Sequence, residues 1–472
     1  MKEFKPGGYW ELWNVAYPLI LVNASHSIMQ FTDRKFLSMK STVDVAAALP
    51  GGILCFTLFS FFLVTTTFTS AIVAQFHGKG DNAACARAPW AGFSFALLAG
   101  LLSSYALPPL GEWLIGVGGH SPDMAARELE YFGTLMPGAG FACAGAAFCS
   151  FFSGRGKTLV VAVIQFAGCG LNVLLAYLMI FGCSFCPALG IVGAGVSTTL
   201  ASAFSALLAF LAFALVDQRR YPTRKWAAMR FSDLKRMLAF GTPCGLEVLC
   251  GVAAFTFIVF LIGELGDVAM TATTICMSIN MLSFLPLLGM SEATSVLVGK
   301  YVGMGRRDVS EAVGHRAWKM ASVYMLFAGA VFVLFPQELF GFFSPKAANG
   351  VDFAAVMAYA VPLLWCVAAY NFFDATDYIY MGALRGAGDT AFPMWVTVLC
   401  SWLVMVPGVL VLILCFHASV VGVWVFISAY ILMVSLIMYF RFKSGVWKKF
   451  DMTAEPPLPE QRAFSPEPDL PL

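Results

Sequence analysis

The chain has 472 residues, of which 59% are hydrophobic and only 12% are charged, and its net charge at pH 7 is +2. A soluble domain carries roughly 25% charged residues, so this composition excludes a water-soluble globular protein and indicates a chain that lies in lipid. A net charge this close to zero gives no basis for binding to nucleic acid.

The first predicted element is a spanning helix that follows a polar, turn-rich segment at residues 1–12. No small-residue cleavage pattern follows the apolar stretch, so we expect an uncleaved first helix and no signal peptide. A spanning helix needs about 20 mostly apolar residues. By that criterion the chain has twelve spans, near residues 13–36, 46–74, 89–109, 130–152, 159–182, 190–216, 237–262, 270–299, 317–336, 355–382, 392–415 and 419–441.

A basic, polar segment at residues 217–236 divides these spans into two sets of six. We therefore predict an N-terminal six-helix bundle at residues 1–216, a cytoplasmic linker at 217–236 and a C-terminal six-helix bundle at 237–450. Residues 451–472 are rich in Pro and Glu, cannot bury a core, and are predicted to be disordered. With both termini in the cytoplasm, 24 of the 29 Lys and Arg residues fall in inner segments, and this excess predicts that orientation.

The two sets of spans carry matching Pro and Gly positions in the same order, at offsets between 225 and 232 residues. Parallel repeats of this kind are related by an axis along the membrane normal, and a site between them can be opened to either side. The repeat favours a transporter, although channels and membrane enzymes can also have repeats. The matched pairs are Pro18 and Pro243, Gly78 and Gly303, Gly156 and Gly388, and Gly193 and Gly422.

Several longer segments carry a family resemblance. They are LWNVAYPLILVNASHSIMQFTDRKFLS in the first span, VAQFHGKGDNAACARA after the second, LNVLLAYLMIFG and GIVGAGVSTTLA in the fifth and sixth, and FFDATDYIYMGALRGAGDTAFP around the tenth. Over nearly all of residues 9–445 the chain resembles multidrug and toxic compound extrusion (MATE) exporters. The resemblance implies two bundles around a central cleft. It also implies export of organic, often cationic, compounds driven by inward flow of protons or sodium ions.

Acidic groups inside spanning helices cost roughly 2.5–3.5 kcal/mol on insertion scales, so each is a functional candidate. In the first span, His26, Gln30 and Asp33 are spaced by four and three residues and share one helical face. We expect His26 and Gln30 to contact substrate and Asp33, which matches the acid in the first helix of MATE exporters, to couple an ion. The alternative is that Asp33 is an interfacial group beside Arg34 and Lys35.

Two further polar residues lie near positions where MATE exporters carry functional groups. Asn172 in span 5 matches the family's Asn, but Ala176 stands where many relatives have an Asp, which weakens the ion site of the first half. Glu247 follows Pro243 in span 7, whereas relatives often carry an acid one turn later, at Gly251 in this chain. One turn is about 5.4 Å, so Glu247 could reach the same cavity. Both residues are candidates for ion coupling, and Asn172 could instead be a helix-packing group.

Span 10 carries Asn371, Asp374 and Asp377 at spacings of three residues, on one helical face. Two carboxylates this close cannot both ionise cheaply, so one is expected to take up and release a proton near neutral pH. Asp374 matches the family's acid in this helix, both Asp residues are assigned to ion coupling, and Asn371 is expected to contact substrate. The alternative is a satisfied polar interface. Glu292 in span 8 is a further buried acid whose role the sequence leaves open.

The cysteines are mostly scattered through apolar runs, as small hydrophobic residues would be. Cys183 and Cys186 are the exception, because they lie in a predicted outer loop. They could form a disulfide, but no neighbouring His or Cys completes a metal site, and a plain loop is the simpler interpretation.

These features predict a secondary active antiporter of the cell inner membrane that exports organic, cationic compounds in exchange for protons or sodium ions. We expect a monomer without a cofactor, with a small-molecule substrate and the lipid bilayer as its partners. The alternative is a flippase for a lipid-linked substrate; such proteins tend to hold several Arg and Lys in the cleft, whereas the spans here hold acids.

Enzymes and channels fit the sequence less well. The five histidines are dispersed, and no metal or nucleophile spacing appears. No pore motif is visible, and without a GxxxxGK[ST] motif the energy should come from an ion gradient.

Overall fold

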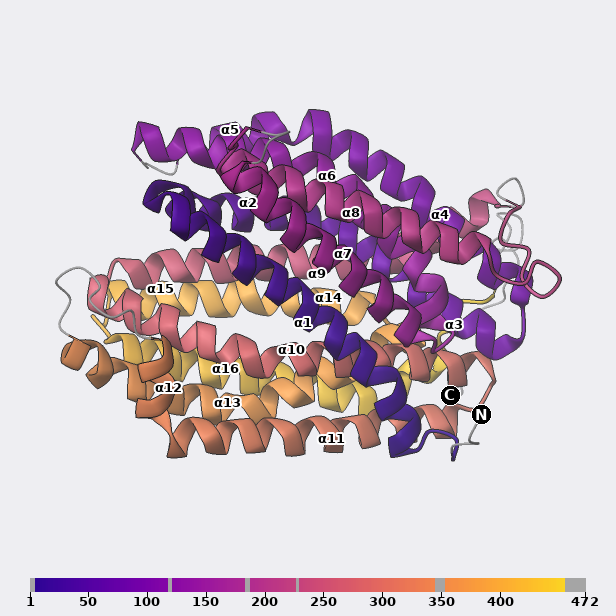
Figure 1. Ribbon diagram of the computed structural model, residues 1–472. Coiled ribbons are helices and arrows are strands. Elements are labelled where there is room, and N and C mark those ends of the chain that lie inside the picture. Colours follow the sequence, from indigo (N-terminus) through magenta and orange to yellow (C-terminus); the bar gives the residue numbers. More distant parts are fainter. Residues whose placement is uncertain (1–4, 118–120, 183–186, 226–228, 344–352, 455–472) are drawn as a thin grey trace.

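The computed structural model describes residues 5–117, 121–182, 187–225, 229–343 and 353–454, in which helices are joined by short turns and loops (Figure 1). The N-terminal half forms α1 (Tyr9–Lys40), α2 (Thr42–Thr67), α3 (Thr69–Lys79), α4 (Asn82–Leu101), α5 (Pro108–Val117), α6 (Pro122–Gly154), α7 (Thr158–Phe181) and α8 (Ile191–Ala214). The C-terminal half forms α9 (Phe231–Gly263), α10 (Asp267–Gly303), α11 (Arg307–Leu334), α12 (Pro336–Phe343), α13 (Phe353–Ala387), α14 (Ala391–Cys400), α15 (Val406–Leu414) and α16 (Val420–Lys443), followed by a 3-10 turn at Val446–Lys449.

The predicted architecture of twelve spanning helices in two six-helix bundles is confirmed, although three spans contain more than one helical segment. Span 2 consists of α2 and α3. Spans 3 and 11 each contain a π-helical turn, at Leu102–Ala106 and at Ser401–Met405. Within the described residues, eleven segments are long and apolar enough to cross a membrane. The remaining span is α1, whose 32 residues extend about 48 Å at roughly 1.5 Å per residue, but whose polar stripe lowers its hydropathy.

Two short helices that the sequence did not predict occupy corresponding places in the two halves. α5 follows the third span and α12 follows the ninth, and each begins at a proline. With 10 and 8 residues they are too short to cross a membrane, and proline is favoured in the first turn of a helix. Their equivalent positions are a further sign of the pseudo-symmetry.

The pseudo-symmetry extends to backbone conformation at the glycines that end corresponding helices. Gly80 and Gly305 have φ angles of 81° and 74°, and Gly156 and Gly388 have φ angles of 70° and 101°. This left-handed region is open to glycine without steric cost. The matched glycines of the sequence therefore end equivalent helices in the same way.

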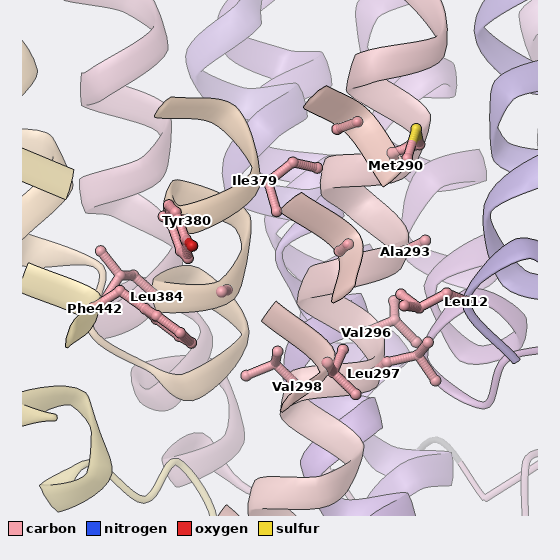
Figure 2. Close-up of a cluster of buried hydrophobic side chains, with 14 of the residues drawn as sticks. Leu12, Met290, Ala293, Val296, Leu297, Val298, Ile379, Tyr380, Leu384 and Phe442 are labelled. Atoms are coloured by element: carbon pink, nitrogen blue, oxygen red, sulfur yellow. The ribbon is translucent and has the colours of Figure 1, made fainter. Parts of the chain in front are cut away.

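The two halves exchange their first helices at the end of the molecule where both termini lie, called here the termini end (Figure 1). Leu12 of α1 is buried in a hydrophobic core formed mainly by α10, α11, α13 and α16. Figure 2 shows Leu12 beside Val296 and Leu297 of α10. In return, Met237 and Cys244 of α9 lie in a core of the N-terminal half. Each half is therefore completed, at this end, by a helix from the other.

The predicted linker and the predicted disordered tail both extend too far. α9 begins at Phe231, so the end of the predicted linker 217–236 is helical. Residues 451–454 are packed and not disordered, because Met452 is only 1% exposed and lies in a core of the N-terminal half. One apolar side chain is enough to hold this short segment, which an average over the whole tail conceals. Residues 455–472 lie outside the described residues.

Candidate functional site

Asp33 lies on the buried face of α1, seven residues before the helix ends at Lys40. At roughly 1.5 Å per residue it is about 10 Å from that end of the helix. Its side chain is 5% exposed, whereas Arg34 and Lys35 are exposed. The alternative of an interfacial carboxylate beside these two cations therefore does not describe this structure.

A short hydrogen-bonded chain joins Asp33 to the other predicted ion-coupling residue of this half. The hydroxyl oxygen of Thr198, on α8, lies 3.3 Å from Asp33 Oδ2. Asn172 Nδ2, on α7, donates to the same hydroxyl oxygen at 3.2 Å, and Asn172 is fully buried. The structure thus brings Asp33 and Asn172 together through a threonine that the sequence analysis did not single out.

Thr198 can serve both charge states of Asp33. Its hydroxyl oxygen also lies 3.0 Å from the carbonyl oxygen of Ala194, but a hydroxyl has a single proton to donate. When Asp33 is ionised, the hydroxyl can donate to the carboxylate. When Asp33 is protonated, the acid can donate to the hydroxyl, which then donates to Ala194. The same atoms accommodate a charged and a neutral Asp33, as an exchanging site requires.

The three predicted substrate-contacting residues differ in accessibility. His26 and Gln30 are exposed on α1 and are free to meet a ligand. Asn371 is fully buried on α13 and touches no substrate in this state. Neither its amide nitrogen nor its amide oxygen has a hydrogen-bond partner among the described residues. The expectation of a wall residue at Asn371 is thus not what the structure shows, because that side chain points into the bundle interior.

In the C-terminal half the acidic stripe of α13 continues to a base at the end of the helix. Asp374 is 7% exposed and Asp377 is half-buried, with its Oδ1 unpartnered among the described residues. Arg385 lies eight residues beyond Asp377, which is the same face two turns further on. It was expected in an inner loop, but α13 extends to Ala387 and carries it as a helical residue.

Arg385 forms an ion pair with Glu247 of α9. Its Nη2 lies 2.8 Å from Glu247 Oε2, and the side chains are 19% and 3% exposed. The Thr397 hydroxyl, on α14, donates to Glu247 Oε1 at 3.3 Å. Glu247 is thus held by a fixed cation, which distinguishes it from the other predicted coupling residues. Asp377 lies within electrostatic range of both Glu247 and Arg385.

Glu292 of α10 is exposed, not buried as expected. Its neighbours Ser291, Ala293 and Thr294 are buried, so α10 turns this carboxylate away from its packed face. The charge of Arg385 acts on Glu292 as well. The C-terminal half therefore sets a single base among several acids.

Of the residues that the sequence analysis missed, Arg385 carried a signal and Thr198 did not. The stripe of positions 374, 377, 381 and 385 follows helical spacing, so extending it would have placed Arg385 on the acidic face of α13. Thr198 lies in a run of Ser and Thr residues within an apolar helix, and nothing in the sequence distinguishes it from its neighbours.

Two remaining expectations concern metals and cysteines. Across the described ranges, no three His, Cys, Asp or Glu side chains converge on a point that could hold a metal ion. Cys183 and Cys186 lie outside the described residues. The chemistry that this arrangement offers is reversible neutralisation of buried carboxylates.

The chain matches the family model described as MatE in two blocks, residues 18–178 and 243–411. The two blocks start at Pro18 and Pro243, the first matched pair of the internal repeat, and cover more than half of the chain. The resemblance seen in the sequence is therefore confirmed by an independent comparison.

Named relatives and solved structures agree with the family match. The chain is 26% identical over 454 residues to the probable multidrug resistance protein NorM of Thermotoga maritima, covering 95% of each protein. It is 29% identical over 432 residues to the NorM of Pseudomonas syringae pv. tomato, covering 89% of this chain and 92% of that protein. A structure described as the outward-facing conformation of a multidrug resistance MATE family transporter matches with a TM-score of 0.82 at 19% identity, over 93% of this chain and 96% of that one.

Proposed function

Because this chain belongs to the MatE family of multidrug efflux transporters, we propose that it is an antiporter that exports organic cations in exchange for protons or sodium ions. Membership of this family makes it a multi-pass membrane transporter and not an enzyme. The relatives are named for multidrug resistance, which supports a range of organic substrates.

The observation that carries this proposal is a buried carboxylate whose hydrogen-bond partner is neutral. Asp33 contacts the Thr198 hydroxyl, and its Oδ1 has no partner among the described residues. A buried charge is costly unless something compensates it. With a neutral partner, that compensation is left to an incoming proton, sodium ion or cationic substrate.

The mechanism we propose is competition between substrate and coupling ion. Ionised carboxylates in the interior attract a cation from the cytoplasm, and a proton or sodium ion arriving from outside neutralises them and favours release. The strength of the coupling equals the difference in affinity of each ligand for the two states of the protein. Asp33 with Asn172 and Thr198 serves this purpose in one half, and Asp374 with Asp377 serves it in the other.

The proposed orientation places the termini end in the cytoplasm of the cell that carries the protein in its inner membrane. The excess of Lys and Arg in segments that face this end supports the assignment. We propose that one copy of the chain is sufficient, because its two pseudo-symmetric halves provide both sides of the transport path.

The alternative of a lipid-linked substrate is disfavoured by the state of the interior cation. A flippase would use Arg or Lys to hold a pyrophosphate group, but Arg385 is already paired with Glu247 at 2.8 Å. An anionic headgroup would have to displace that carboxylate.

Efflux from proteoliposomes tests the proposal. A fluorescent organic cation is loaded, and its export is followed under an imposed proton gradient and then under an imposed sodium gradient. We expect one gradient to drive export, and the double variant Asp33→Asn, Asp374→Asn to abolish it. Export that depends on neither gradient would overturn the antiporter proposal.

A further inference from the structure

The termini end is the place where the backbones of the two halves come closest. A Cβ added to Gly78 of α3 would lie 2.0 Å from the carbonyl oxygen of Lys300, and one added to Gly303 of α10 would lie 2.0 Å from that of Gln75. Gly78 and Gly303 are a matched pair of the repeat. α3 and α10 therefore cross with direct backbone contact, and any larger residue at either glycine would separate them.

Gln75 lies at this crossing, and its amide hydrogen-bonds in three directions. The side chain is fully buried. Its Nε2 donates to the carbonyl oxygens of Gly386 and Ala387 at 3.0 and 3.1 Å, and its Oε1 accepts from the backbone N–H of Met452 at 2.9 Å. The last carbonyls of a helix have no partner within it. Gln75 of the N-terminal half therefore caps α13 of the C-terminal half and fixes residues 451–454 to both.

The equivalent position in the other half makes the reciprocal contact. An offset of 225 residues places Lys300 opposite Gln75 in the repeat. Lys300 Nζ lies 2.8 Å from Glu11 Oε1 at the start of α1, and the Tyr301 hydroxyl donates to Glu11 Oε2 at 2.6 Å. Each half thus uses the same turn of its second span to hold a segment of its partner.

The segment 451–454 is attached to the N-terminal half and to α9 by more than Gln75. The carbonyl oxygen of Ala454 accepts from Arg236 Nη2 at 3.1 Å, and the Thr453 hydroxyl accepts from Lys79 Nζ at 3.2 Å. The Met452 side chain is buried in the core that contains α3 and α4. The chain that leaves the last span therefore crosses back over the junction between the halves.

The ionisation of Asp451 does not limit this attachment at neutral pH. Burial alone would raise its pKa, but hydrogen bonds from Thr453 and the charge of Lys79 bring the pKa below its usual value. A group with a lowered pKa stays ionised above that value and loses its contribution only as the pH falls into the acid range. The attachment is thus separate from any titration of the buried carboxylates.

We propose that Gln75 is a positioning residue of the transport cycle, which clamps the end of α13 and residues 451–454 and so stabilises the state that is closed at the termini end. Opening this end requires α3 to separate from α10, and that movement breaks all three hydrogen bonds of the Gln75 amide. The clamp acts through α13, because Arg385 lies one residue before the first clamped carbonyl and Asp374 and Asp377 lie on the same helix. This inference rests on the chain being a transporter but not on the identity of the ion or substrate.

Distance measurements test the clamp without any transport assay. Nitroxide labels are attached to unnatural amino acids at Ala83 and Arg307, which are exposed at the starts of α4 and α11, and distances are measured by pulsed electron resonance in lipid nanodiscs without substrate. We expect one short population in the parent protein. Gln75→Leu keeps the side-chain volume but removes three hydrogen bonds, so a longer population should grow about ten-fold or more.

Two truncations provide a matched pair in the same labelled background. A chain that ends at Phe450 lacks the clamped segment and should show the longer population, whereas a chain that ends at Ala454 retains the segment and should match the parent. If Gln75→Leu does not fold, this pair decides the question alone. An unchanged distance distribution in the chain that ends at Phe450 would overturn the clamp, whatever the efflux assay shows.

Discussion

The two halves share a backbone but not a charge distribution. In the N-terminal half Asp33 is a single buried acid that contacts a threonine, with Asn172 one step further. In the C-terminal half Glu247 is paired with Arg385, and Asp374 and Asp377 follow on the same face of α13. One site can be neutralised only by an arriving ligand, whereas the other already contains a fixed cation.

This difference shows that the repeat determines where helices lie but not where charge lies. At the offset of 225 residues, the position equivalent to Asp33 is Ile258 and the position equivalent to Glu247 is Val22. Neither acid is repeated. A fold built by duplication can therefore acquire two unlike sites by single substitutions, and the two sites should respond differently to the same mutation.

The largest expected effect comes from breaking the ion pair of the C-terminal half. Arg385→Gln leaves Glu247 buried without its cation, which costs about 3–5 kcal/mol, reduced somewhat by the partial exposure of Arg385. The double variant Glu247→Gln, Arg385→Gln should recover most of that loss. The free energy of unfolding, measured by denaturant titration in mixed micelles, checks this. Equal stability of the single and double variants would mean that the pair is not coupled.

The next effect distinguishes ion coupling from packing in the same half. Asp374→Asn removes a titratable group with little change of shape, so efflux should fall about 5- to 150-fold, the range of typical coupling free energies. The amount of inserted protein should not change. Efflux from proteoliposomes at equal protein content is the measurement, and wild-type efflux from this variant would refute the role of Asp374.

A smaller effect is expected from the hydroxyl that joins Asp33 to Asn172. Thr198→Val keeps the shape of the side chain but removes one hydrogen bond of about 1 kcal/mol, so the affinity for the coupling ion should fall about five-fold. Thr198→Ser keeps the hydroxyl and is the matched control. Ion titration of the efflux rate compares the two variants, and identical titration curves would exclude a role for the hydroxyl.

The smallest effect concerns the exposed acid of the C-terminal half. Because Glu292 is exposed, Glu292→Gln should change the free energy of unfolding by less than about 0.5 kcal/mol. The same titration in mixed micelles measures it beside Arg385→Gln. A loss as large as that of the ion-pair variant would show that Glu292, and not Glu247 alone, compensates the charge of Arg385.

The sequence was sufficient wherever the signal was local or repeated. Runs of about 20 apolar residues gave the spans, because lipid leaves the backbone no other partner than its own helix. Matched prolines and glycines gave the repeat, and the spacing of three between Asp374 and Asp377 placed both on one face. The family resemblance placed Asp33 and Asn172 in one site, and the structure joins them.

What only the tertiary structure decided is which side chains meet across helices. The pairing of Arg385 with Glu247, the position of Thr198 between Asn172 and Asp33, the exchange of α1 and α9, and the clamp at Gln75 all join segments far apart in the chain. Helical periodicity assigns a residue to a face, but the partner on the facing helix depends on how the helices cross and at what depth. That geometry is fixed by packing of the whole bundle, and no local pattern contains it.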